Sequence, residues 1–274
     1  MKIAAIKPAK AKAETLLPRT LAVDIGGSGI KTIVLDPYGA PITERNRIAT
    51  PPRATPDQVL GVIAKLAAAQ GPFERVSAGF PGVIKNGATF TATNLGKGWI
   101  GFQLAKAVSE SLGRPARVAN DADIQGLGVI SGHGVELVIT LGTGLGSVLF
   151  VDGHRIHIEL SHHPFRKGLS YEDELGKRAL KSGGGKKWNK RLLEAITLLK
   201  QTFIYDRFYI GGGNTKFITI KLPPEVTIVS NESGLLGGIK LWEDSSGADS
   251  QSNRAAPTAV LDAPGSSAEN PPVD

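Results

Sequence analysis

Two glycine-rich segments of similar design lie at residues 24–31 and 141–146, more than a hundred residues apart. Each lies between segments whose apolar and β-branched residues predict β-strands. Glycine permits a positive φ and a close approach of the backbone to a ligand, so that N–H groups can point at phosphate oxygens. Ser28 and Thr143 add hydroxyl donors. Either turn alone is equally well explained by a tight β-hairpin. Together they predict one phosphate-bearing substrate held from two sides.

The order of the predicted elements around these turns occurs twice. In each copy, three consecutive strands are followed by helix and strand units, which predicts a duplicated α/β fold of two lobes with a cleft between them. We expect an N-terminal lobe at 20–119 and a C-terminal lobe at 120–244. The predicted strands are 21–24, 32–36, 42–49, 75–79, 116–119, 136–141, 146–151, 154–158, 207–210 and 226–229, and the predicted helices are 56–67, 102–112, 171–180, 188–203 and 233–242.

The two ends differ in composition from the rest. Residues 1–19 and 245–274 show no apolar period, and both are expected to be disordered. The formal charge of the chain is +7. Counting Lys, Arg, Asp and Glu gives +4 for the first segment and −3 for the last, which leaves +6 for residues 20–244. That excess fits a polyanionic partner or substrate, or simply a soluble basic surface.

The chain has no cysteine, which excludes disulfides, thiolate zinc sites and cysteine nucleophiles. This usage fits a reducing cytoplasm, where we expect the protein to reside. No apolar run approaches the roughly 20 residues that span a bilayer, and no secretory signal is expected at the N-terminus. We therefore expect no membrane association.

Seven ordered motifs resemble the sugar kinases of the ROK family (repressors, open reading frames, kinases), and most of all its polyphosphate-dependent glucokinases. The resemblance covers roughly residues 21–242. It implies the actin-like ATPase (ribonuclease H-like) fold and phosphoryl transfer to the 6-hydroxyl of glucose. The motifs are D-I-G-G-S-G-I-K at 24–31, G-F-P-G at 79–82, N-L-G-K-G-W at 94–99, N-D-A-D at 120–123, T-L-G-T-G-L-G at 140–146, E-L-S-H at 159–162 and G-G-G-N at 211–214.

Asp121 resembles the catalytic base of the family. Transfer to a sugar hydroxyl needs an acceptor for its proton while the phosphate is held in line. A carboxylate at the end of a strand facing a cleft can take that proton. The alternative is that Asn120 and Asp121 only cap a helix that starts near Ala122.

The resemblance also implies a glucose pocket formed by Gly82, Asn94, Asn120, Glu159 and His162. A buried set of polar groups suits a hexose, which presents both donors and acceptors. The chain departs from the family twice, because Ser161 replaces the usual glycine and the cysteine-rich zinc motif is absent. We therefore expect no zinc.

Both glycine turns are expected to hold the phosphoryl donor, and the third glycine cluster borders the nucleotide site of the family. Asp24 would act through a magnesium ion by way of water, because a carboxylate repels phosphate. The expected phosphate-binding residues are Asp24, Gly26, Gly27, Ser28, Gly29, Lys31, Gly142, Thr143 and Gly144, and the expected nucleotide-binding residues are Gly211, Gly212 and Gly213.

The donor is polyphosphate, ATP or both. Lys186, Lys187, Lys190 and Arg191 lie in a stretch without acids, read as a basic loop leading into a helix, which would suit a phosphate chain or simply form a solvated helix start. The alternatives are a strictly ATP-dependent hexokinase for glucose or mannose, and a catalytically silent sugar-binding protein. A DNA-binding repressor is disfavoured because only about twenty residues precede the first strand, so no nucleic-acid partner is expected. By analogy with the family, we expect a homodimer.

Overall fold

The computed structural model describes residues 17–92, 95–230 and 233–243. The predictions of disorder for the two ends therefore lie outside the described residues, apart from residues 17–19. Within the described part, no helix combines the length and the apolar character needed to cross a membrane.

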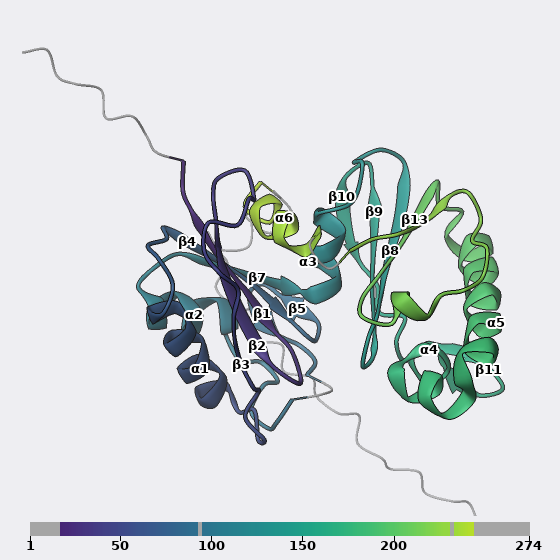
Figure 1. Cartoon of the computed structure of the whole chain (residues 1–274), viewed down its shortest axis with the longest axis horizontal. Coiled ribbons are helices and arrows are strands. Elements are labelled where there is room, and N and C mark those ends of the chain that lie inside the picture. The colour runs from purple at the N-terminus through teal and green to yellow at the C-terminus, as the bar shows by residue number, and fades with distance from the viewer. Residues whose placement is uncertain (1–16, 93–94, 231–232, 244–274) are drawn as a thin grey trace, which may run out of the picture.

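Two five-stranded sheets form the framework (Figure 1). The first has the order β3-β2-β1-β4-β7, and the second has the order β10-β9-β8-β13-β14. In each, three antiparallel strands are followed by two strands parallel to the first of the three. The strands are β1 (Thr20–Ile25), β2 (Ile30–Leu35), β3 (Asn46–Ile48), β4 (Arg75–Phe80), β7 (Ala116–Asn120), β8 (Val135–Leu141), β9 (Leu145–Val151), β10 (His154–His157), β13 (Arg207–Gly211) and β14 (Val226–Ile228).

The identical strand order confirms the predicted duplication. The central strands are apolar almost throughout because both faces of each sheet are covered. In β4, for example, five of the six residues are buried. Two hairpins were not predicted, because elements of two or three residues are too short to show a period: β5 (Ile84–Lys85) with β6 (Ala88–Thr89), and β11 (Pro164–Arg166) with β12 (Leu169–Ser170).

Helices cover the sheets in layers. α1 and α2 pack on one face of the first sheet, α3 and α6 lie between the two sheets, and α5 covers the outer face of the second sheet (Figure 1). α1 buries one stripe of side chains, including Val59, Ile63 and Leu66, against the first sheet. The helices are α1 (Pro56–Ala68), α2 (Leu104–Leu112), α3 (Asp121–Leu127), α4 (Tyr171–Leu175), α5 (Lys177–Phe203) and α6 (Ser233–Lys240), with a short 3-10 turn η1 (Thr215–Phe217).

The basic stretch at 181–191 is helical, and the prediction of a loop there was wrong. It belongs to α5, which departs from helical geometry at Gly184, where φ is 73°. Glycines disfavour a helix, but tertiary packing overrides that preference. Trp188 is fully buried and donates from Nε1 to the carbonyl of Leu175 at 2.8 Å. This anchor holds the helix in place directly after the glycines.

Candidate active site

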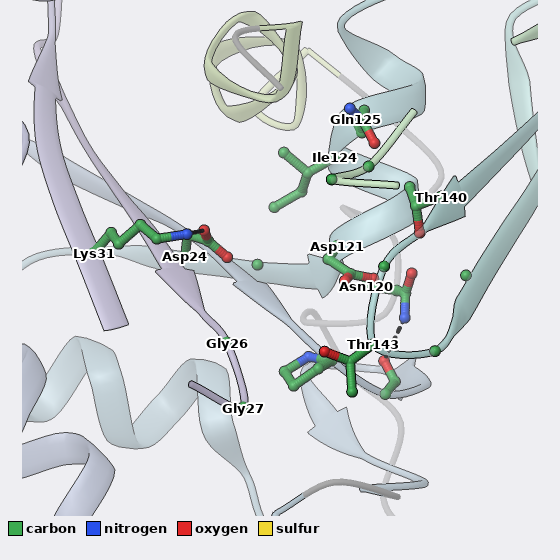
Figure 2. A pocket seen from close by; sticks show the side chains of 18 of the residues that line it. Asp24, Gly26, Gly27, Lys31, Asn120, Asp121, Ile124, Gln125, Thr140 and Thr143 are labelled. Carbon is green, nitrogen blue, oxygen red and sulfur yellow. Dashed lines mark hydrogen bonds and ion pairs between the residues drawn. The ribbon is translucent and has the colours of Figure 1, made fainter. Parts of the chain in front are cut away.

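A cavity of about 660 Å³ lies between the two sheets. Its walls include both glycine turns and the start of α3. Figure 2 shows Asp24 and Lys31 on one side, with Asn120, Asp121 and Thr143 toward the other. The structure therefore brings the two predicted phosphate-binding turns to a single site. Of the predicted residues, the lining includes Asp24, Gly26, Gly27, Ser28, Lys31, Gly82, Asn120, Asp121, Gly142, Thr143, Gly144, Glu159, Gly212 and Gly213.

Asp121 is the first residue of α3, at the point where β7 ends. Asn120 caps this helix, because its Oδ1 accepts from the Ala122 N–H at 2.8 Å, and its Nδ2 donates to the Gly82 carbonyl at 2.9 Å. The Ala122 N–H also reaches Asp121 Oδ1 at 2.8 Å. Helix capping and a place in the cavity wall therefore coexist at these two residues, since the turn that starts the helix also places both at the cavity.

The surroundings make Asp121 an unusual carboxyl group. It lies deep among protein atoms, yet its side chain is open to the solvent that fills the cavity. Desolvation, helped by the negative charges of Asp24 and Asp123, raises the pKa of Asp121 to about 7, against the opposing effect of the Ala122 N–H. A carboxylate that exchanges a proton near neutral pH is suited to general base chemistry.

Close packing around this carboxylate explains a glycine of the second turn. A Cβ on Gly146 would lie 2.6 Å from Thr140 Oγ1, 3.0 Å from Ala122 Cβ and 3.4 Å from Asp121 Oδ1. A Cβ on Gly144 would lie 2.4 Å from Glu172 Oε2, the far end of a flexible side chain. Space is therefore limiting at Gly146, whereas at Gly144 a shift of the Glu172 side chain could relieve the contact.

The expected positive φ is not found at these turns. None of the glycines at 26, 27, 29, 142, 144 and 146 is among those with positive φ. Of the three glycine clusters, only the third has a glycine with positive φ, Gly212 with φ 91°. A Cβ on Gly212 would lie 2.4 Å from the Leu141 carbonyl oxygen, so this glycine permits close contact beneath the second turn.

The first glycine turn is joined to charged groups. Lys31 Nζ lies 2.9 Å from Asp24 Oδ2, and Arg45 Nη2 lies 3.6 Å from the same oxygen. Asp24 and Lys31 share a face because they are direct partners in the β1–β2 ladder. Gly29 does not line the cavity, since it is buried and would meet the guanidinium of Arg47 if it carried a Cβ.

The third glycine cluster supports the second turn. Asn214 donates from Nδ2 to the Gly142 carbonyl at 2.8 Å and from its backbone N–H to the Leu141 carbonyl at 2.9 Å. Gly211 does not line the cavity, because it packs against the side chain of Gln125. The cluster thus contributes Gly212 and Gly213 to the wall.

The predicted sugar-binding residues are only partly brought together. Glu159 lines the cavity, and Ser161, the residue in the family's glycine position, donates from Oγ to Glu159 Oε1 at 2.5 Å. His162 is exposed and is not part of the described lining. Asn94 lies outside the described residues.

Sequence reasoning missed Glu172. This side chain, near the start of α4, lines the cavity, and its Oε2 accepts from the Leu145 N–H at 3.1 Å. Only the chain's path through the β11–β12 hairpin brings it beside the second turn, so no spacing in the sequence indicates it.

The four basic residues predicted for polyphosphate fall into two kinds. Lys186, Lys187 and Lys190 are exposed on α5, and none of them lines the cavity. Arg191 is mostly buried, with Nε 2.7 Å from Oε2 of the buried Glu174. The charge of Arg191 is thus paired inside the protein. The role of all four residues remains a prediction.

Comparison with known proteins places the chain in a family. The model of the ROK family matches residues 20–159, which is more than half of the chain. The chain belongs to the ROK family. As a ROK protein with two sheets of identical order, it has the predicted actin-like ATPase fold.

Several relatives of this ROK protein are sugar kinases. The polyphosphate glucokinase of Mycobacterium tuberculosis is 28% identical over 234 residues, covering 78% of this chain and 88% of that protein. The solved inorganic polyphosphate/ATP-glucomannokinase from Arthrobacter sp. strain KM is 30% identical, with a TM-score of 0.74 over 82% of this chain and 98% of that one. A ROK family glucokinase from Streptomyces griseus, in complex with glucose and AMPPNP, shares the fold at 20% identity, with a TM-score of 0.64, over 81% of this chain and 98% of that one.

Proposed function

We propose that this ROK protein is a glucokinase that transfers a phosphoryl group from inorganic polyphosphate, with ATP as a second donor, to the 6-hydroxyl of glucose. One observation carries the proposal: the Asp121 carboxylate stands in the same cavity as both glycine turns. Phosphoryl transfer to an alcohol requires a group that accepts the proton of the hydroxyl and a backbone that binds the phosphate.

In this mechanism Asp121 accepts the proton of the 6-hydroxyl. The hydroxyl oxygen bonds to the terminal phosphorus of the donor, while the bond from that phosphorus to the bridging oxygen breaks. Polyphosphate leaves one phosphate unit shorter, and ATP leaves as ADP. The glycine turns, with Ser28 and Thr143, hold the transferred group in line, and Glu159 and Glu172 supply acceptors for sugar hydroxyls.

Asp24 suits a magnesium ion. Its carboxylate lines the cavity and is about half exposed, and magnesium commonly binds through one or two carboxylates, waters and substrate phosphates. Within the described residues there is no group of three or more His, Asp or Glu that could hold a metal. Asp24 would therefore hold the ion through water, and the ion, when bound, would neutralise phosphate charge.

Two lines of support favour polyphosphate. The relatives at 28–30% identity carry polyphosphate in their names. The described lining of the cavity also contains no aromatic side chain on which a nucleobase could stack, whereas it is rich in glycine backbone. A strictly ATP-dependent hexokinase is the competing assignment.

A donor panel tests the proposal. Purified full-length protein is mixed with glucose, Mg²⁺ and either ATP or long-chain polyphosphate, and glucose 6-phosphate is followed. We expect turnover with polyphosphate, lost in Asp121→Asn. Turnover with ATP alone would refute the donor assignment. Glucose binding without transfer from either donor would indicate a silent sugar-binding protein.

A further inference from the structure

The cavity has a basic edge that the proposed function leaves unassigned. It consists of Arg45, directly before β3, and Arg47 within β3. Arg45 lines the cavity beside Asp24, and Arg47 donates from Nη2 to the Ser28 carbonyl at 2.7 Å. Both side chains are substantially exposed. The two arginines thus adjoin the first glycine turn directly.

The pairing of β1, β2 and β3 places further charged residues in a row that runs from the cavity to the edge strand β3. Asp24, Lys31 and Arg47 stand opposite one another in β1, β2 and β3 and therefore share a face. Neighbouring strands are about 4.8 Å apart, so the row covers roughly 10 Å from Asp24 to the edge strand. Lys31, Arg45 and Arg47 face one carboxylate, Asp24. Among the described residues no carboxylate pairs with Arg47, so the row keeps an excess of positive charge.

The chemistry of the two donors differs at the end far from the transferred group. ATP ends in a nucleoside, whereas every unit of inorganic polyphosphate carries a negative charge. Arginine binds phosphate oxygens through two parallel N–H donors. A row of cations that continues beyond the glycine turns is therefore useful only to a donor whose negative charge also continues.

We propose that Arg45 and Arg47, together with Lys31, form a subsite for the distal phosphates of long-chain inorganic polyphosphate. This inference rests on the proposed function, because it assumes that the terminal phosphates lie at the glycine turns. The lysines of α5 are the rival route. They lie on a helix that covers the outer face of the second sheet, and none of them lines the cavity (Figure 1). By contrast, Arg45 lines the cavity, and Arg47, which is not part of the described lining, donates to the carbonyl of Ser28, which is.

Kinetics with donors of different length test the subsite. The double variant Arg45→Gln/Arg47→Gln is compared with the wild type using long-chain polyphosphate, tripolyphosphate and ATP at saturating glucose. We expect the ratio of KM for the long chain to KM for ATP to rise about tenfold, with tripolyphosphate close to ATP. The slope of log KM for the long chain against log salt should fall by roughly 1 to 2.

Two further variants separate charge from folding. Arg114→Gln is the matched control, because this exposed arginine also donates to a backbone carbonyl, that of Phe73, and does not line the cavity. It should leave the KM ratio at the wild-type value. Arg47→Lys keeps the positive charge without the forked guanidinium. Its KM ratio should lie between that of the wild type and that of the double variant.

The possible failures are distinguishable. If the wild type uses only ATP, the donor assignment fails and the subsite with it. If the wild type uses polyphosphate but the double variant keeps the wild-type KM ratio, the subsite alone is wrong. The KM for long-chain polyphosphate could instead rise in Lys186→Gln/Lys187→Gln/Lys190→Gln and stay unchanged in the double arginine variant. That result would place the distal phosphates on α5 and refute the subsite.

Discussion

Activity should fall steeply below pH 7 through the protonation of one carboxyl group. The surroundings raise the pKa of Asp121 to about 7, and a protonated carboxyl group cannot accept the proton of the sugar hydroxyl. The ionised fraction is about one half at pH 7, about a tenth at pH 6 and about a hundredth at pH 5. We therefore expect log(kcat/KM) for glucose to fall with a slope near one below pH 7.

The assay measures kcat/KM for glucose at saturating donor from pH 5 to 9. Terminal phosphates also titrate near pH 6, so the profile is recorded with both ATP and polyphosphate. A group on the enzyme gives the same acid limb with the two donors. A rate that stays level down to pH 5, or an acid limb that follows the donor, would refute the assignment of Asp121 as the base.

Removing a neighbouring charge gives a second test of the same reasoning. The negative charge of Asp24 helps to raise the pKa of Asp121. Asp24→Asn should therefore move the acid limb to lower pH, whatever it does to the maximal rate. The control is Asp57→Asn, which removes an exposed carboxylate from α1, on the opposite face of the first sheet, and should leave the acid limb in place.

Three further predictions concern stability and packing. Asp121→Asn should reduce turnover by about 10²- to 10⁴-fold. It should also raise the thermal midpoint at pH 8, because a carboxyl pKa raised by folding costs stability above that pKa. The difference in thermal midpoint between Asp121→Asn and the wild type should vanish below about pH 4. Equal midpoints of the two proteins at pH 8 would contradict the raised pKa. Gly146→Ala should reduce kcat about 100-fold in the glucose assay, because the new Cβ would lie 2.6 Å from Thr140 Oγ1 and displace the turn beside the base, whereas an unchanged kcat would show that the turn adapts. Glu174→Gln should lower the free energy of unfolding in urea by about 3 kcal/mol, because it leaves buried Arg191 without its partner. The exposed Glu194→Gln should cost less than about 1 kcal/mol, and equal losses would argue against a buried network.

The sequence predicted well what depends on local pattern. Strand alternation and the glycine turns repeat in the same order, so the duplicated fold could be inferred before any coordinates. Asp121 was singled out because its motif resembles that of the ROK kinases, and its place between a predicted strand and a predicted helix was equally consistent with a helix cap. These features depend on neighbours within a few residues along the chain.

Features that depend on tertiary contact were missed. Glu172 reaches the cavity only because the β11–β12 hairpin returns the chain to the second turn. Arg191 looked like part of a free basic loop, since nothing near it in the sequence reveals that Glu174 is buried against it. The reason for the glycine at 146 was also misjudged, because its constraint is a lack of space and not a backbone angle.

The position of Asp121, the proposed base, depends on the last described helix. Ser77 of β4 donates from Oγ to the Gly238 carbonyl of α6 at 2.5 Å, and Trp242 donates from Nε1 to the same Oγ at 2.9 Å. A Cβ on Gly237 would lie 1.7 Å from the Ile124 carbonyl oxygen, so only glycine lets α6 approach α3 this closely. Because Asp121 begins α3, the contacts of α6 with both the first sheet and α3 help to fix the position of Asp121. Gly237, a residue type that on its own weakens a helix, is thus required where α6 must approach the helix that begins with Asp121.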